Sequence, residues 1–130
     1  MYDVYSELEK LHYKTVELDC GGNIIIEDTA AMIVIDINQG SASSYMEANY
    51  AAAKEIARQI KLRNLNGIII IDFINVVKKG EREKVINIIE QSLAHDIGNT
   101  QVHGFTRLSM LEITRKRRTG SVSEKIGYRD

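Results

Sequence analysis

The spacing of apolar positions divides the chain into segments with two different periods. Apolar residues alternate with polar ones, or run together, in short segments that predict strands over residues 14–18, 24–26, 32–37, 68–74 and 100–104. Elsewhere they recur every three to four positions, which predicts helices over residues 2–11, 45–64 and 81–94 and a short helix over 108–116.

Glycine and serine mark the breaks between these segments. Gly21 and Gly22 separate the first two predicted strands, and we expect a hairpin turn there because glycine adopts positive φ without strain. Residues 39–44, with Gly40 and three serines, are expected to form a loop. The run over residues 68–74 is almost wholly β-branched or aromatic, which predicts a strand buried on both faces.

A hairpin followed by alternating strands and helices is typical of an α/β layered domain. We therefore expect a mixed β-sheet flanked by helices. The sequence has no internal boundary and no tandem repeat, so residues 1–118 are predicted to form one domain. Residues 119–130 lack an apolar period and are predicted to form a loose tail.

The composition is that of a globular protein. Its 130 residues are 44% hydrophobic and 27% charged, which excludes a disordered chain. No apolar run approaches the ~20 residues of a membrane span. The single cysteine, Cys20, indicates a reducing compartment, and no secretory segment follows Met1, so we expect a cytoplasmic location.

Charge is distributed unevenly along the chain. Residues 1–50 carry nine acidic and two basic side chains (net −7), whereas residues 51–130 carry nine acidic and fifteen basic ones (net +6). This distribution suits either a cation site beside an anion-binding surface or an ordinary solvated surface.

Two near-duplicate segments each place one carboxylate near the end of an apolar run. Asp36 lies in IVIDIN and Asp72 in IIIDFIN. If the two strands are parallel neighbours joined by the intervening helix, the two carboxylates lie side by side at the carboxyl edge of the sheet, where ligands gather. Asn38 would share their face, since it is two residues from Asp36. Oxygen ligands of this kind suit Mg²⁺ or Mn²⁺, and the alternative is that both aspartates cap loop amides.

Other known metal-binding motifs fit the sequence less well. Asp36, Asn38 and Glu47 match positions 1, 3 and 12 of a calcium-binding loop, but Ser41 stands where that loop needs glycine, so we reject it. His12, His95 and His103 lack zinc-site spacing.

Basic side chains concentrate near the end of the chain. We consider Arg107, Arg115 and Lys116 as candidate contacts to a phosphate backbone, with a solvated face as the alternative. Asn49, on the inner stripe of the long helix, suits either a buried structural hydrogen bonder or a group that supports a metal ligand.

Longer segments resemble a known family. The run CGGNIIIEDTAAMIVIDIN over residues 20–38 resembles a stretch of the ribonuclease E/G family. So do NYAAAKEIARQIKLR over 49–63, GIIIIDFI over 67–74 and LEITRKR over 111–117. These segments occur in the family's order over nearly the whole chain.

The resemblance implies a DNase-I-like catalytic subdomain. In the family the two strand aspartates, here Asp36 and Asp72, bind magnesium, and the asparagine after the first, here Asn38, is catalytic. The implied reaction is Mg²⁺-dependent endonucleolytic cleavage of single-stranded RNA by a metal-activated water, leaving 5′-phosphate and 3′-hydroxyl ends. Mn²⁺ is a possible substitute for Mg²⁺.

The family's RNA-binding domain, 5′-end sensor and zinc-binding cysteine pair have no counterpart within residues 1–130. We therefore expect no zinc here, and weak or no activity from the chain alone. Single-stranded RNA, those other domains and a further copy of the full-length enzyme are the expected partners. The alternative is a non-catalytic RNA-binding or interaction module that retains the fold.

Overall fold

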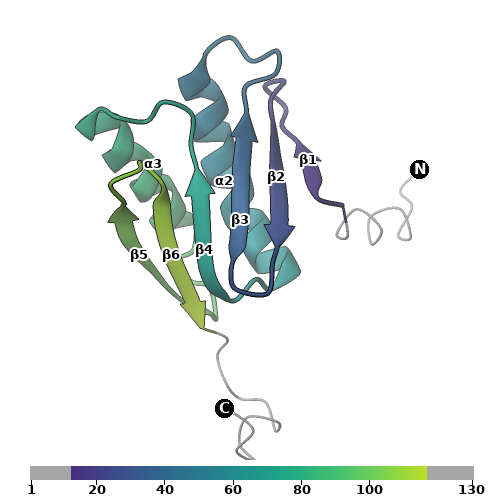
Figure 1. The fold of residues 1–130 in the computed structure, drawn as a ribbon, viewed down its shortest axis with the longest axis vertical. Helices are drawn as coiled ribbons and strands as arrows, with labels where there is room; N and C mark the ends of the chain where they lie inside the picture. The colour runs from purple at the N-terminus through teal and green to yellow at the C-terminus, as the bar shows by residue number, and fades with distance from the viewer. Residues whose placement is uncertain (1–12, 117–130) are drawn as a thin grey trace, which may run out of the picture.

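A computed structural model describes residues 13–116, which form one six-stranded sheet and two helices (Figure 1). Their order along the chain is β1 (Thr15–Glu17), β2 (Asn23–Asp28), β3 (Ile33–Asn38), α2 (Tyr45–Arg63), β4 (Gly67–Asp72), α3 (Lys79–Ser92), β5 (Asn99–Phe105) and β6 (Leu111–Lys116). The expected α/β class is confirmed, and the arrangement is consistent with a DNase-I-like subdomain. The helix predicted over 2–11 and the tail over 119–130 lie outside the described residues.

The sheet has the strand order β1-β2-β3-β4-β6-β5. Four of its five neighbouring pairs are antiparallel, and β3 and β4 are parallel. Helix α2 supplies the crossover that a parallel pair needs. The predicted hairpin at Gly21 and Gly22 is confirmed, because β1 and β2 pair on either side of it and Gly21 has a φ of 106°.

Both helices cover the same face of the sheet (Figure 1). Helix α2 contacts β2 and β3, helix α3 contacts β5, and the two helices pack on each other. The core lies between these layers and consists mainly of alternate strand residues and the inner stripe of α2, among them Ile24, Ile35, Ile71, Ile56 and Ile113. The other face of the sheet is not covered by any described element.

This one-sided arrangement corrects the prediction that strand 68–74 is buried on both faces. Ile69 and Ile71 are fully buried under the helices, but Ile68 is 45% exposed and Ile70 is only partly buried. The run of isoleucines follows the high strand propensity of β-branched residues rather than burial on two sides.

The short helix predicted over residues 108–116 is also wrong. Residues 106–110 form a turn, in which Thr106 N–H donates to the carbonyl of Met110, and strand β6 follows. Leu111, Ile113 and Arg115 are buried while Glu112 and Lys116 are exposed, so the segment has a period of two. Arg115 breaks the apolar pattern that would have revealed this period.

Candidate active site

Asp36 and Asp72 lie side by side. They are direct register partners on the parallel strands β3 and β4, and neighbouring strands lie about 4.8 Å apart. Both side chains are exposed, whereas Ile35, Ile37 and Ile71 are buried on the helical side. The carboxylates therefore occupy the uncovered face, at the end of the sheet where β3 and β4 terminate.

The carboxylates have no compensating basic partner. Within residues 13–116, neither Asp36 nor Asp72 forms an ion pair or accepts a hydrogen bond from a loop amide. Partial burial, and then the charge of Asp36, raises the pKa of Asp72 above its ordinary value. This geometry gives no support to the alternative in which the two aspartates cap loop amides.

Asn38 lies on the same face, and a residue on the neighbouring strand orients it. Its Nδ2 donates to Oδ1 of Asn23 at 3.0 Å, and the two residues are register partners of β3 and β2. Because the amide nitrogen is held by Asn23, the Oδ1 atom of Asn38 is left as an acceptor. Sequence reasoning missed Asn23, although the strand register that follows from the loop at residues 29–32 would have indicated it.

Close packing of two turns supports this end of β3. Ser41 N–H donates to the carbonyl of Gly21 at 3.0 Å, which ties the β1–β2 turn to the loop after Asn38. A Cβ atom on Gly22 would meet the carbonyl oxygen of Asn38 at 2.6 Å. Glycine is therefore required at this contact because the two backbones approach so closely.

Glu47 has a structural role. Its Oε1 accepts from both the backbone N–H and the hydroxyl of Ser43, and its own N–H donates to Oγ of Ser44 at the start of α2. The hydrogen bonds from Ser43 lower the pKa of Glu47. This is a capping arrangement, in agreement with the rejection of a calcium loop.

The three candidate phosphate contacts fall in three different environments. Arg107 is exposed in the β5–β6 turn, which lies at the same end of the sheet as Asp72 because Leu111 pairs with Ile71. Lys116 is exposed at the opposite end of β6, where it pairs with Asn99. Of the three, only Arg107 therefore lies at the same end of the sheet as the two carboxylates.

Arg115 requires a correction, because its guanidinium group faces the protein and the residue is 2% exposed. Nε and Nη2 donate to the two carboxylate oxygens of Asp96 at 2.7 and 2.9 Å. Nη1 lies within hydrogen-bonding distance of Oδ1 of Asn64, the carbonyl of Leu65 and Oδ1 of Asn66. With its donors used in this way, Arg115 is a structural residue rather than a phosphate contact.

A shallow groove of about 360 Å³ lies beside Asp36 on the uncovered face. It is lined by Ile25, Glu27, Thr29, Val34 and Asp36. The groove places apolar side chains next to a free carboxylate, and an extended ligand could follow it toward the end of β3.

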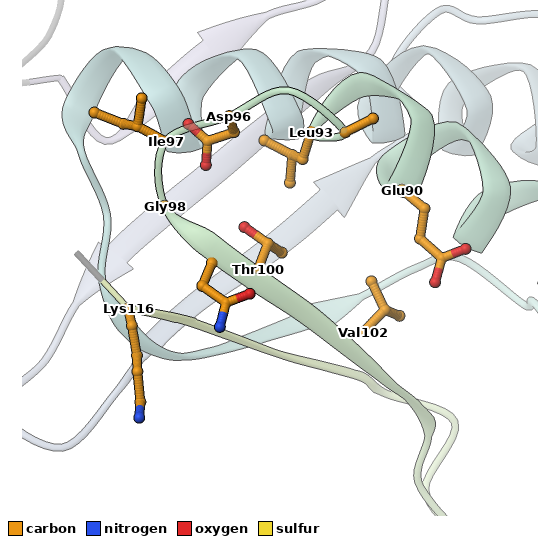
Figure 2. Close-up of a pocket in the computed structure, with 10 residues that line it drawn as sticks. Glu90, Leu93, Asp96, Ile97, Gly98, Thr100, Val102 and Lys116 are labelled. Atoms are coloured by element: carbon orange, nitrogen blue, oxygen red, sulfur yellow. The ribbon is translucent and has the colours of Figure 1, made fainter. Parts of the chain in front are cut away.

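A larger cleft of about 730 Å³ lies away from the carboxylates, between α3, the segment after it and the edge strand β5 (Figure 2). Its lining includes Leu93, Ile97, Thr100 and Val102, and the register of β5 and β6 shifts between Val102 and Gly104. Such a bulge protects an edge strand against pairing with another chain. Neither Asp36 nor Asp72 lines this cleft, so it is separate from the pair of carboxylates at the ends of β3 and β4.

Comparison with known proteins shows the family to which the chain belongs. The family model of the ribonuclease E/G family matches residues 1–118, and the chain belongs to this family. It is 41% identical over 129 residues to ribonuclease G of Salmonella typhimurium strain SL1344, an alignment that covers 94% of this chain and 26% of that protein. Ribonuclease G of Escherichia coli K12 is 40% identical, with the same coverage of each chain.

A ribonuclease E is also among the relatives. The protein of that name from Synechocystis is 40% identical over 119 residues, which cover 86% of this chain and 18% of the relative. The chain thus spans about a quarter or less of the length of these relatives. In the part of the chain that the structure describes, no helix is long and apolar enough to cross a membrane.

Proposed function

We propose that this chain is the Mg²⁺-dependent catalytic subdomain of an endoribonuclease that hydrolyses single-stranded RNA to 5′-phosphate and 3′-hydroxyl ends. The observation that carries the proposal is the pairing of Asp36 with Asp72 on an accessible edge, without a basic partner in residues 13–116. Membership of the ribonuclease E/G family supports the reaction class. We also propose that the enzyme acts in the cytoplasm.

The donor set fits a hard divalent cation. Asp36 and Asp72 offer carboxylate oxygens, and Asn38 offers an amide oxygen already oriented by Asn23. The described residues contain no cluster of three or more His, Cys, Asp or Glu side chains that could hold a metal. Two carboxylates suit magnesium, which keeps several waters and binds substrate phosphate rather than an all-protein cage. Mn²⁺ accepts the same oxygen ligands.

Asp36 and Asp72 would hold the metal, which when bound supplies positive charge to the phosphoryl oxygens and lowers the pKa of water. The chain's own residues set the geometry. Asn38 directs an oxygen to the same face, where it can accept a hydrogen bond from a water or a ribose hydroxyl. Arg107, which is exposed at the same end of the sheet, would pair with a phosphate further along the RNA.

The uncovered face of the sheet accommodates the substrate. Single-stranded RNA is flexible and exposes its phosphates, so it can lie across an open face that a rigid duplex would meet only at one edge. The groove beside Asp36 extends the site in this direction. In full-length relatives, we propose, additional domains and a further enzyme copy complete the RNA contact, so that the chain alone cleaves weakly or not at all.

Metal binding is the direct test. We would titrate the chain with Mn²⁺, following free Mn²⁺ by electron paramagnetic resonance, and compare Asp36→Asn and Asp72→Asn with Asp28→Asn. Asp28 is an exposed carboxylate at the opposite end of β2, paired with Ile33, so it is a matched control. We expect Mn²⁺ binding to be lost in the first two variants and kept in the third. Equal binding by all of the variants would exclude the metal site.

Cleavage is tested in a chimera in which this chain replaces the homologous segment of Escherichia coli ribonuclease G. End-labelled single-stranded RNA should be cut only with Mg²⁺ or Mn²⁺, and EDTA or Asp72→Asn should abolish the cut. A chimera in which Asp72→Asn cleaves at the normal rate would contradict the proposed role. A chimera that binds RNA but does not cleave it with any metal would favour the non-catalytic module.

A further inference from the structure

We infer that Asn49 is a positioning residue for the proposed metal site, acting through the backbone that follows Asp72. The inference rests on the proposed function, because the site it positions is the one formed by Asp36 and Asp72. Asn49 lies on α2 and is fully buried, with 0% exposure. Its side chain therefore acts within the protein rather than on RNA or metal.

The Asn49 amide binds both backbone groups of one residue. Its Nδ2 donates to the carbonyl of Ile74 at 2.7 Å, and its Oδ1 accepts from the Ile74 N–H at 2.9 Å. A neighbouring strand would make the same two hydrogen bonds. The side chain of Asn49 thus takes the place of a pairing strand at Ile74, two residues beyond Asp72.

That support is needed because the sheet ends before Ile74. The last register pair between β3 and β4 is Asp36 with Asp72, and the last between β4 and β6 is Ile71 with Leu111. The next residue after Ile74, Asn75, is left-handed with a φ of 46°. Without Asn49, the N–H and carbonyl of Ile74 would lose their partners, which is costly for partly buried backbone groups.

Arg82 holds a later residue of the segment that follows β4. Arg82 of α3 donates from Nε to the carbonyl of Val76 at 2.9 Å and from Nη2 to Oγ of Ser109 at 2.8 Å, and its guanidinium lies 4.7 Å from the centre of the Phe105 ring. Asn49 binds Ile74, which is closer in sequence to Asp72 than is Val76, the residue that Arg82 binds. It therefore controls the direction in which β4 leaves the sheet beside the carboxylates.

A purely structural role and a positioning role for Asn49 predict different effects on metal affinity. Loss of a purely structural bond lowers stability and leaves the metal affinity of the folded protein unchanged. Loss of a positioning bond lowers metal affinity in molecules that remain folded, and groups that orient metal ligands typically contribute ~10–100-fold in affinity. The useful readout is therefore the Mn²⁺ dissociation constant, measured well below the unfolding midpoint of each variant.

The variant is Asn49→Leu, which has the same number and branching of side-chain heavy atoms and removes both hydrogen bonds. The matched control is Gln59→Leu, because Gln59 is also a buried amide of α2 (5% exposed) but bonds to Glu55 and Arg63 on its own helix. We expect ~10–100-fold weaker Mn²⁺ binding for Asn49→Leu. For Gln59→Leu we expect binding within twofold of the unsubstituted chain.

The outcomes separate the two proposals. If the unsubstituted chain binds no Mn²⁺, the proposed metal site fails. If it binds Mn²⁺ and Asn49→Leu binds equally well, the metal site stands and the positioning role is overturned. Should Asn49→Leu not fold, Asn49→Val carries the same test, since valine is smaller than leucine and also removes both hydrogen bonds to Ile74. Unchanged Mn²⁺ affinity in that folded variant would likewise overturn the positioning role.

Discussion

Asp36 and Asp72 are register partners on the one parallel strand pair of the described sheet, and each carries its charge beside the other without a basic partner in residues 13–116. Two like charges in this position oppose folding unless a cation lies between them. The same relationship that suits metal binding is therefore expected to lower the stability of the metal-free protein.

Asp72→Asn should make the metal-free protein at least as stable at neutral pH as the unsubstituted chain. The pKa of Asp72 is raised in the folded state, so the native protein holds its proton more tightly than the unfolded chain does. Stability from this group is highest in acid and falls as pH rises through the folded pKa, and the asparagine variant should lack this fall. Urea unfolding between pH 3 and pH 7, with EDTA present, measures the difference. A large destabilisation by Asp72→Asn would instead indicate a capping role.

Arg115→Met should destabilise the fold strongly. Arg115 is 2% exposed and its removal leaves the carboxylate of Asp96, itself 5% exposed at the side chain, without its main partner. Breaking a buried pair by removing one member costs about 3–5 kcal/mol. Urea unfolding at pH 7 measures the loss, and Lys116→Met, an exposed change at the next position, should alter stability by less than about 0.5 kcal/mol. Similar small values for both variants would contradict the structural role of Arg115.

The same ion pair predicts a pH dependence of the opposite sign to that of Asp72. The side-chain hydrogen bond from Arg115 lowers the pKa of Asp96 in the folded state. The stability that this pair contributes is therefore present above the unfolded pKa and is lost as pH falls through the folded pKa. Subtracting the pH profile of Asp96→Asn from that of the unsubstituted chain should give a difference that shrinks toward acid. A difference in stability that stays constant with pH would show that Arg115 does not stabilise the ionised form of Asp96.

Ser44→Ala should cost about 1 kcal/mol through loss of the helix cap. Ser44 has an extended backbone and its hydroxyl accepts from the N–H of Glu47 at 3.1 Å. Ser44→Gly is the control, since glycine at this position costs only a few tenths of a kcal/mol. Thermal unfolding of the two variants separates the cap from a general effect of substitution. An alanine variant as stable as the unsubstituted chain would mean that the hydroxyl does not cap α2.

The pairing of β3 with β4 could be predicted from the sequence for a physical reason. A long amphipathic helix between two apolar strands forces a crossover, and a crossover makes the strands parallel. Asp36 and Asp72 occupy equivalent places in those strands, so their proximity follows once the strands are neighbours. The two candidate metal ligands thus follow from the pattern of the sequence alone.

The features that escaped prediction depend on contacts between distant residues. From the sequence, Arg115 is expected to be a surface cation, because no neighbouring residue in the sequence indicates that Asp96 and the end of α2 surround it. Its burial also hides the period of β6, which led to the wrong prediction of a helix. The exposure of Ile68 follows from both helices packing on one face, which the order of elements alone does not determine.

The parallel pairing of β3 and β4 also has a consequence for folding. The antiparallel pairs β1–β2, β2–β3 and β5–β6 join segments that are consecutive in the chain, whereas Asp36 and Asp72 meet only after the 35 residues between them have closed into a loop. Loop closure over that span is slower and entropically more costly than hairpin formation. We therefore expect the two carboxylates to come together after the hairpins have formed, so that the arrangement proposed to bind metal is completed late in folding.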